Sequence, residues 1–131
     1  MISTRGRYAL RVLAYMASNP TEGYIPLKDI TSRLEISQKY LEGIMTSLSK
    51  AGLVEAIHGK GGGYRLSKAP ADYSIGEILK LTENSMAPVS CLEDGAPACE
   101  KASECKTLPM WNKLNTLMND YLNSVSLEEI M

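Results

Sequence analysis

Hydrophobic residues recur every three or four positions over residues 5–18, which predicts a first helix. The same spacing occurs in two shorter stretches, one beginning near Pro26 and one following Ser37. Only the tripeptide EIS joins them, and Ser37 is a residue type that caps helix N-termini. Two short helices connected this tightly predict a helix-turn-helix unit. The residues expected on their buried faces are Leu27, Ile30, Leu34, Leu41, Ile44, Met45 and Leu48.

Two short strand-like runs follow, over residues 53–58 and 64–68, on either side of GKGGG. A five-residue loop with four glycines predicts the tip of a hairpin. A nucleotide-binding loop has four residues between two glycines and then the sequence Gly-Lys-Ser/Thr, and this loop has neither feature. A helix-turn-helix followed by a hairpin is the layout of a winged helix. The alternative interpretation is a hairpin that has no role in binding.

The rest of the chain predicts two further helices around a loop. Ser74 and Glu77 form a capping box at the start of the first, and a stretch rich in Pro, Gly and small residues follows. The last helix carries large apolar residues at spacings of three, four, three and four, which favours a seam between two copies over packing on its own domain. The seam residues are Trp111, Leu114, Met118, Tyr121 and Val125.

We therefore expect a mainly α fold. A winged helix-turn-helix DNA-binding domain is predicted over residues 1–72, and a cysteine loop with a long C-terminal dimerisation helix over 73–131. No run of eighteen apolar residues occurs and the N-terminus does not resemble a secretory signal, so no membrane partner and a cytoplasmic location are expected.

Charge is divided unevenly along the chain. Residues 1–70 carry ten Lys and Arg against five Asp and Glu, whereas residues 71–131 carry four against ten, so balances of +5 and −6 give the net charge of −1. A basic first half indicates a polyanion partner for that half.

In a helix-turn-helix unit, side chains at the exposed start of the second helix read base edges in the major groove. Any capped helix exposes polar residues there, but as a set following a tight turn in a basic region they favour DNA contact. The wing and the start of the first helix would contact phosphates. The predicted DNA-binding residues are Arg5, Arg7, Ser37, Gln38, Lys39, Tyr40, Glu42, His58, Lys60, Gly61 and Arg65.

The three cysteines of the chain, Cys91, Cys99 and Cys105, lie within fifteen residues and have carboxylates beside them. Structural zinc sites place ligands in pairs two to four residues apart, and no such pair occurs here. Widely spaced thiolates can instead hold an iron–sulfur cluster. A two-iron cluster needs four protein ligands, so the three cysteines leave one ligand position to be filled by another group.

Several segments resemble the IscR/NsrR/CymR group of bacterial transcription regulators: TRGRYALRVLAYMA, YLEGIMTSLSKAGLVEAIHGKGGGYRLSK, IGEIL, the three cysteines and LPMWNKLN. The resemblance implies a winged-helix homodimer that binds a palindromic operator in double-stranded DNA. In the cluster-binding members it also implies a [2Fe-2S] cluster on three loop cysteines, which match Cys91, Cys99 and Cys105.

The fourth ligand does not carry over from the resemblance. Leu108 stands where the iron–sulfur assembly regulators have a histidine, and Arg7 stands where the nitric-oxide-sensing members have an acidic ligand. A small thiol, water or a group from a partner chain would also serve, and His58 belongs to the wing. The loop carboxylates that remain candidates are Glu93, Asp94, Glu100 and Glu104.

We thus expect a homodimeric transcriptional repressor that senses redox or iron–sulfur status. Two alternatives stay open: a cluster-free regulator in which the cysteines act as a thiol switch, and a regulator controlled by docking a metabolic enzyme. An enzyme is not expected, since no nucleophile–base pair or cofactor loop is evident and the sole histidine is in a loop. No small-molecule substrate is expected.

Overall fold

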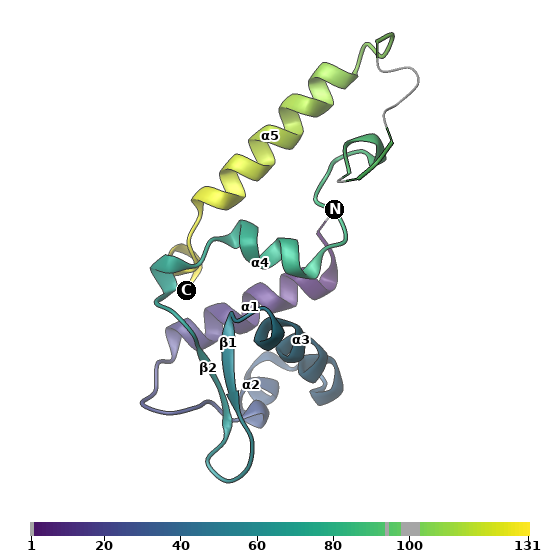
Figure 1. Ribbon diagram of the computed structural model, residues 1–131. Coiled ribbons are helices and arrows are strands. Elements are labelled where there is room, and N and C mark those ends of the chain that lie inside the picture. Colours follow the sequence, from purple (N-terminus) through teal and green to yellow (C-terminus); the bar gives the residue numbers. More distant parts are fainter. Residues whose placement is uncertain (1, 94, 98–102) are drawn as a thin grey trace.

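The computed structural model describes residues 2–93, 95–97 and 103–131, and its head carries a hairpin at one end and a helical stalk at the other (Figure 1). No helix in these residues is long and apolar enough to cross a membrane. The described helices are α1 (Thr4–Ser18), α2 (Leu27–Leu34), α3 (Gln38–Lys50), α4 (Ile75–Thr82) and α5 (Leu108–Ser124), with short 3-10 turns at η1 (Pro70–Asp72), η2 (Ser90–Leu92) and η3 (Leu127–Ile130). The strands β1 (Val54–Ile57) and β2 (Gly63–Leu66) form the hairpin.

The helix-turn-helix predicted from the apolar spacing is confirmed as α2 and α3. The Ser37 side chain caps α3 by accepting a hydrogen bond from the backbone N of Tyr40 at 3.3 Å. Pro26 lies at the N-cap of α2, immediately before the first turn of the helix, whereas the sequence predicted it within that turn. Glu35 closes α2 in the left-handed region (φ 54°), which few non-glycine residues adopt and which no sequence signal marks.

The antiparallel hairpin is also confirmed, with Val54 opposite Leu66 and Ile57 opposite Gly63. Ile25 extends it on the other side, because its N and O bond the O and N of Tyr64 at 2.7 and 2.9 Å. Gly63 has φ +152°, and a side chain on it would collide with the backbone of Ile25. The glycine at this position of GKGGG is therefore required by backbone packing.

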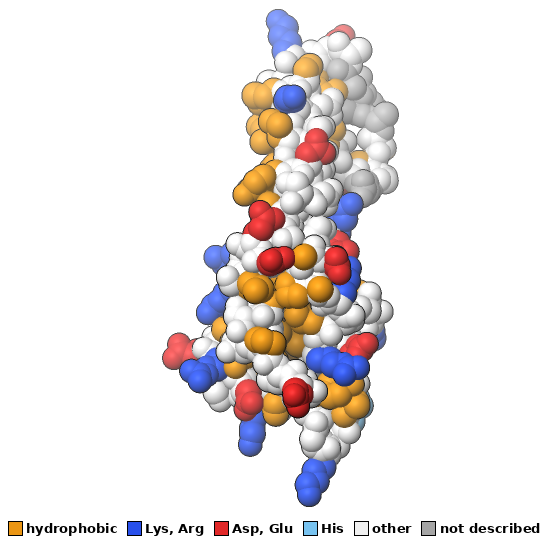
Figure 2. Space-filling view, turned by 90° about the vertical axis from the view of Figure 1, so that its left-hand side faces the viewer, with side chains coloured by type: hydrophobic (Ala, Val, Ile, Leu, Met, Phe, Trp, Pro, Cys, Tyr) orange, Lys and Arg blue, Asp and Glu red, His pale blue; other side chains and the backbone are white. Residues whose placement is uncertain are grey.

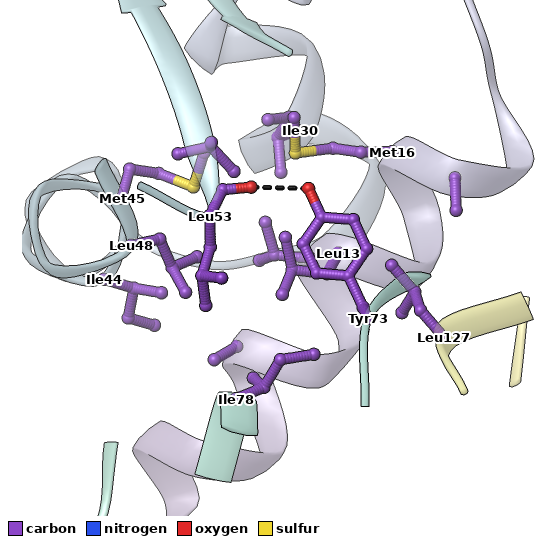
Figure 3. Packing of buried hydrophobic residues seen from close by; sticks show 14 of the residues in the cluster. Leu13, Met16, Ile30, Ile44, Met45, Leu48, Leu53, Tyr73, Ile78 and Leu127 are labelled. Carbon is purple, nitrogen blue, oxygen red and sulfur yellow. Dashed lines mark hydrogen bonds between the residues drawn. The ribbon is translucent and has the colours of Figure 1, made fainter. Parts of the chain in front are cut away.

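The core is one cluster that joins α1, α3 and α4 (Figure 3). The buried members from outside these helices include two from the second half of the chain, Tyr73 and Leu127. Tyr73 is 1 % exposed and donates from its hydroxyl to the carbonyl of Leu53 at 2.6 Å, while Leu127 from η3 is fully buried. The core packing is thus continuous across residue 72. The division of the chain into a DNA-binding part (1–72) and a cysteine-loop and dimerisation part (73–131) remains a prediction about function.

The predicted last helix is confirmed as α5, which extends from the head as the stalk (Figure 1). None of its residues is buried in the single chain. Val125, the last predicted seam residue, lies beyond the helix as its C-cap and packs against the core. The exposed apolar face includes two residues that the seam prediction missed, and it consists of Met110, Leu114, Leu117 and Tyr121. Orange side chains line one edge of the stalk in Figure 2.

Candidate DNA-binding face and cysteine loop

The start of α3 presents its polar side chains to solvent. Buried Leu41 and Ile44 attach the opposite side of the helix to the core. Gln38 donates from Nε2 to Oε1 of Glu42 at 3.0 Å, one helical turn along. The predicted base-contacting residues all lie on this exposed surface: Ser37, Gln38, Lys39, Tyr40 and Glu42.

Helix α1 extends this surface with an aromatic contact that the sequence prediction missed. The rings of Tyr8 and Tyr40 meet edge to face, with centroids 5.8 Å apart. The guanidinium of Arg11 lies 5.2 Å from the centroid of Tyr8. Tyr8 sits at helical spacing in the first predicted helix, but only the fold places it beside α3.

At the wing, His58, Lys60 and Gly61 are exposed. Arg65 lies in β2, where its Nε donates to Oε2 of Glu55 at 2.6 Å. This hydrogen bond with Glu55 raises the pKa of the Arg65 guanidinium. The hairpin thus carries an exposed cation near its tip and a paired one on its strand.

A groove of about 490 Å³ connects α3 with the wing. Its walls come from the start of α2, the outer side of α3 and the loop end of the hairpin, and they include Leu27, Lys28, Thr46, Ile57 and His58. Of the predicted DNA-binding residues, Glu42 of α3 and His58 of the wing line this groove, so one concave surface joins the two elements.

The two arginines at the start of α1 have different surroundings. Arg7 is exposed, and its nearest described polar partner is Thr4 Oγ1 at 3.4 Å. Arg5 is half-buried and donates from Nη2 to the carbonyl O of Gly43 at 3.2 Å and to Oγ of Ser47 at 2.6 Å. Arg7 is oriented to meet solvent or a ligand, whereas Arg5 is bonded to α3.

The cysteine loop connects α4 to α5. Cys91 is exposed within η2, and Cys105 is half-buried just before α5. The Sγ of Cys105 lies 3.5 Å from Oγ1 of Thr107, and hydrogen bonding from Thr107 and from the start of α5 lowers the pKa of this thiol. Both described thiols are accessible, and the thiolate of Cys105 is favoured.

Part of the predicted metal site falls outside the described residues: Cys99, Asp94 and Glu100. Glu93 and Glu104 are described and exposed. Among residues 2–93, 95–97 and 103–131, no three His, Cys, Asp or Glu side chains are grouped as metal ligands. The described chain therefore supplies two sulfur donors from one loop.

Comparison with known proteins covers nearly the whole chain. Residues 2–131 match the Rrf2 family, described as "Iron-dependent Transcriptional regulator". The chain is similar to the HTH-type transcriptional regulator IscR of Aliivibrio salmonicida, with 35% identity over 99% of this chain and 76% of that protein. The IscR of Vibrio cholerae is also 35% identical, over 99% of this chain and 74% of its own length.

Solved structures share the fold. CymR of B. subtilis, titled "the Global Cysteine Regulator", superposes with a TM-score of 0.79 at 34% identity, covering 98% of this chain and 93% of that one. IscR of T. potens gives a TM-score of 0.73 at 29% identity, with 98% and 83% covered.

An oxidized form of Staphylococcus aureus CymR gives a TM-score of 0.72 at 30% identity, with 97% and 92% covered. The named relatives are transcriptional regulators and not enzymes, as the sequence predicts. Together with the family match over residues 2–131, they show that the chain belongs to the Rrf2 family of transcriptional regulators.

Proposed function

We propose that the protein binds a palindromic operator as a cytoplasmic homodimeric repressor, with α3 in the major groove and the wing along the backbone. The observation that carries this proposal is the groove that Glu42 of α3 and His58 of the hairpin both line, together with the exposed polar start of α3. It lies in the basic first half of the chain, which supplies the electrostatic part of DNA binding. The proposed base contacts are Ser37, Gln38, Lys39, Tyr40 and Glu42, and the proposed backbone contacts are Arg7, His58, Lys60, Gly61 and Arg65.

The apolar face of α5 supports the dimer. Four large side chains spaced four, three and four residues apart lie exposed on one face of a helix that extends from the head. Contiguous exposed apolar surface of this kind marks an interaction site. A second copy of the same helix matches its length and chemistry, and a two-fold dimer reads a palindrome.

Gln38 and Lys60 should have distinguishable roles in binding. Gln38→Ala should reduce discrimination between the selected site and a site with one base pair changed by about 1–3 kcal/mol, because a base-edge contact is lost. Lys60→Ala should weaken all duplexes alike and lower the slope of log affinity against log salt by about 0.9, because a phosphate contact is lost.

Titrations at four salt concentrations measure both quantities, and Lys50→Ala, an exposed lysine in the last turn of α3, is the control for charge. Equal effects of Gln38→Ala on matched and mismatched duplexes would show that Gln38 makes no base-specific contact.

We also propose that the loop senses redox or iron–sulfur status through a [2Fe-2S] cluster held by Cys91, Cys99 and Cys105. The described donors suit such a group in chemistry: both are thiols of one loop, and one has its thiolate favoured by neighbouring hydrogen bonds. When bound, the group would supply a centre sensitive to oxidants, nitric oxide or iron supply. Glu93, Asp94, Glu100 and Glu104 remain the loop candidates for the fourth ligand.

Anaerobic purification tests this proposal. We expect visible charge-transfer absorption with nearly equal amounts of iron and acid-labile sulfide per chain. Cys91→Ser and Cys105→Ser should each abolish it, whereas Ser90→Ala, beside Cys91, should leave it unchanged. A colourless protein that also resists reconstitution would contradict a cluster and leave DNA binding standing.

A cluster-free thiol switch is the second candidate. The lowered pKa of Cys105 and the similarity to a CymR crystallised in an oxidized form favour it. It predicts a colourless protein whose affinity for the selected duplex changes on mild oxidation and returns with a thiol reductant. Control by docking a metabolic enzyme has no supporting contact among the described residues.

A further inference from the structure

The start of the cysteine loop is bonded to the start of α1. Glu83 is the C-cap of α4 and the last residue before the loop. Its Oε1 accepts hydrogen bonds from the backbone N of Ser3 at 2.8 Å and from Ser3 Oγ at 2.9 Å. Ser3 is the N-cap of α1 and accepts from the backbone N of Gly6 at 3.1 Å. A carboxylate here complements the positive end of the helix dipole, so the contact is charge-assisted.

The two helices approach closely at this contact. Gly6 is buried against the end of α4, and a side-chain carbon on it would collide with the carboxylate of Glu83. The same carbon would lie 3.0 Å from Thr82 Oγ1 and 3.2 Å from a methyl group of Leu79. Because such packing leaves little space for sliding, a displacement of Glu83 must alter the first turn of α1.

The first turn of α1 is in turn bonded to α3. Arg5 donates to the carbonyl O of Gly43 at 3.2 Å and to Ser47 Oγ at 2.6 Å. Ser47 also donates to the Gly43 carbonyl at 3.2 Å, so the guanidinium closes a small network on the middle of α3. Glu83, Ser3 and Arg5 therefore connect the loop to α3 through direct contacts.

We infer that Glu83 and Arg5 are positioning residues through which the cysteine loop sets the placement of α3. This inference rests on the proposed function, in which α3 reads DNA and the loop senses a signal. A loop rearrangement that moves Glu83 away from Ser3 loosens the first turn of α1 and then the hold of Arg5 on α3. Arg5 thereby has a different role from the phosphate contact expected from the sequence.

The test compares Glu83→Gln, which keeps the shape and removes the charge, with Arg5→Gln and with their double variant. Glu128→Gln, an exposed residue of η3, makes the same charge change as Glu83→Gln and is the control. The probes are a duplex that the wild-type protein selects from random DNA and an unselected duplex, each titrated at several salt concentrations.

We expect Glu83→Gln and Arg5→Gln each to lower the ratio of selected to unselected affinity by about tenfold, with the salt slope unchanged. The loss in the double variant should be no greater than the larger of the two single losses, because both residues act through one set of contacts. The inference is overturned if Glu83→Gln behaves like Glu128→Gln, if the two losses multiply, or if Arg5→Gln lowers the slope by about 0.9.

A measurement without DNA separates this inference from the proposed function. Amide hydrogen exchange in the free protein should be faster over residues 43–47 in Glu83→Gln than in Glu128→Gln, and exchange equal to the control would refute the link. If the wild type selects no DNA, the proposed function fails while this comparison still decides the inference. If Glu83→Gln does not fold, Ser47→Ala, which removes one acceptor of Arg5, carries the affinity test.

Discussion

Leu117→Asp is expected to convert the proposed dimer to a monomer at micromolar concentration. Leu117 is 52 % exposed in the single chain and lies in the middle of the apolar face of α5. In a two-fold dimer the change acts twice, and because Leu117 is already half-buried in the single chain, loss of about 0.8–1.5 kcal/mol of burial per leucine weakens association by at least about tenfold. The charge introduced into an apolar contact adds to this loss. Sedimentation equilibrium over a range of concentrations measures the effect.

Thr116→Asp introduces the same carboxylate at an exposed neighbouring position that points away from the apolar face. It should sediment as the wild type does. A Leu117→Asp protein that remains dimeric would place the dimer contact elsewhere, and a monomeric wild type would remove the basis for a palindromic operator.

Leu127→Ala is expected to lower the free energy of unfolding of the whole head by about 2–5 kcal/mol. Leu127 is fully buried in the core although it follows the stalk, and η3 around it packs on α1 and η1. Shortening it leaves a cavity between segments that are distant in sequence (Figure 3). Urea denaturation monitored by far-ultraviolet circular dichroism, at one fixed protein concentration, measures the change.

Ile130→Ala is the matched control, since Ile130 belongs to the same short turn and is 42 % exposed. It should change stability by no more than about 0.5 kcal/mol. If Leu127→Ala were as mild, the C-terminal segment would be attached to the head without supporting its core.

The helices and the hairpin could be predicted because their signals are local. The spacing of Leu41, Ile44, Met45 and Leu48 defines α3 whatever surrounds it, and Ser37 caps it within the same turn. The exposed start of α3 follows from that pattern, because buried positions determine which side faces outward.

What the sequence could not predict depends on contacts between distant segments. Tyr73 and Leu127 lie outside the helices that the apolar spacing predicted, so no helical pattern marks them as core. Ser3 and Glu83 are eighty positions apart, and the role of Glu83 arises only when α1 and α4 pack. Arginine is a residue type that commonly contacts phosphate. In the fold, however, the guanidinium of Arg5 donates hydrogen bonds to acceptors on α3.

Selection of bound duplexes from random-sequence DNA by the purified full chain tests the central claim most directly. We predict enrichment of an inverted repeat whose half-sites lie on one side of the duplex, about one helical turn apart or a multiple of it, because two α3 helices related by a two-fold axis enter successive major grooves. Parallel selections with protein kept anaerobic and with protein exposed to air show whether the loop changes that preference. Enrichment of no sequence under either condition would contradict the account of α3 as a DNA-reading helix.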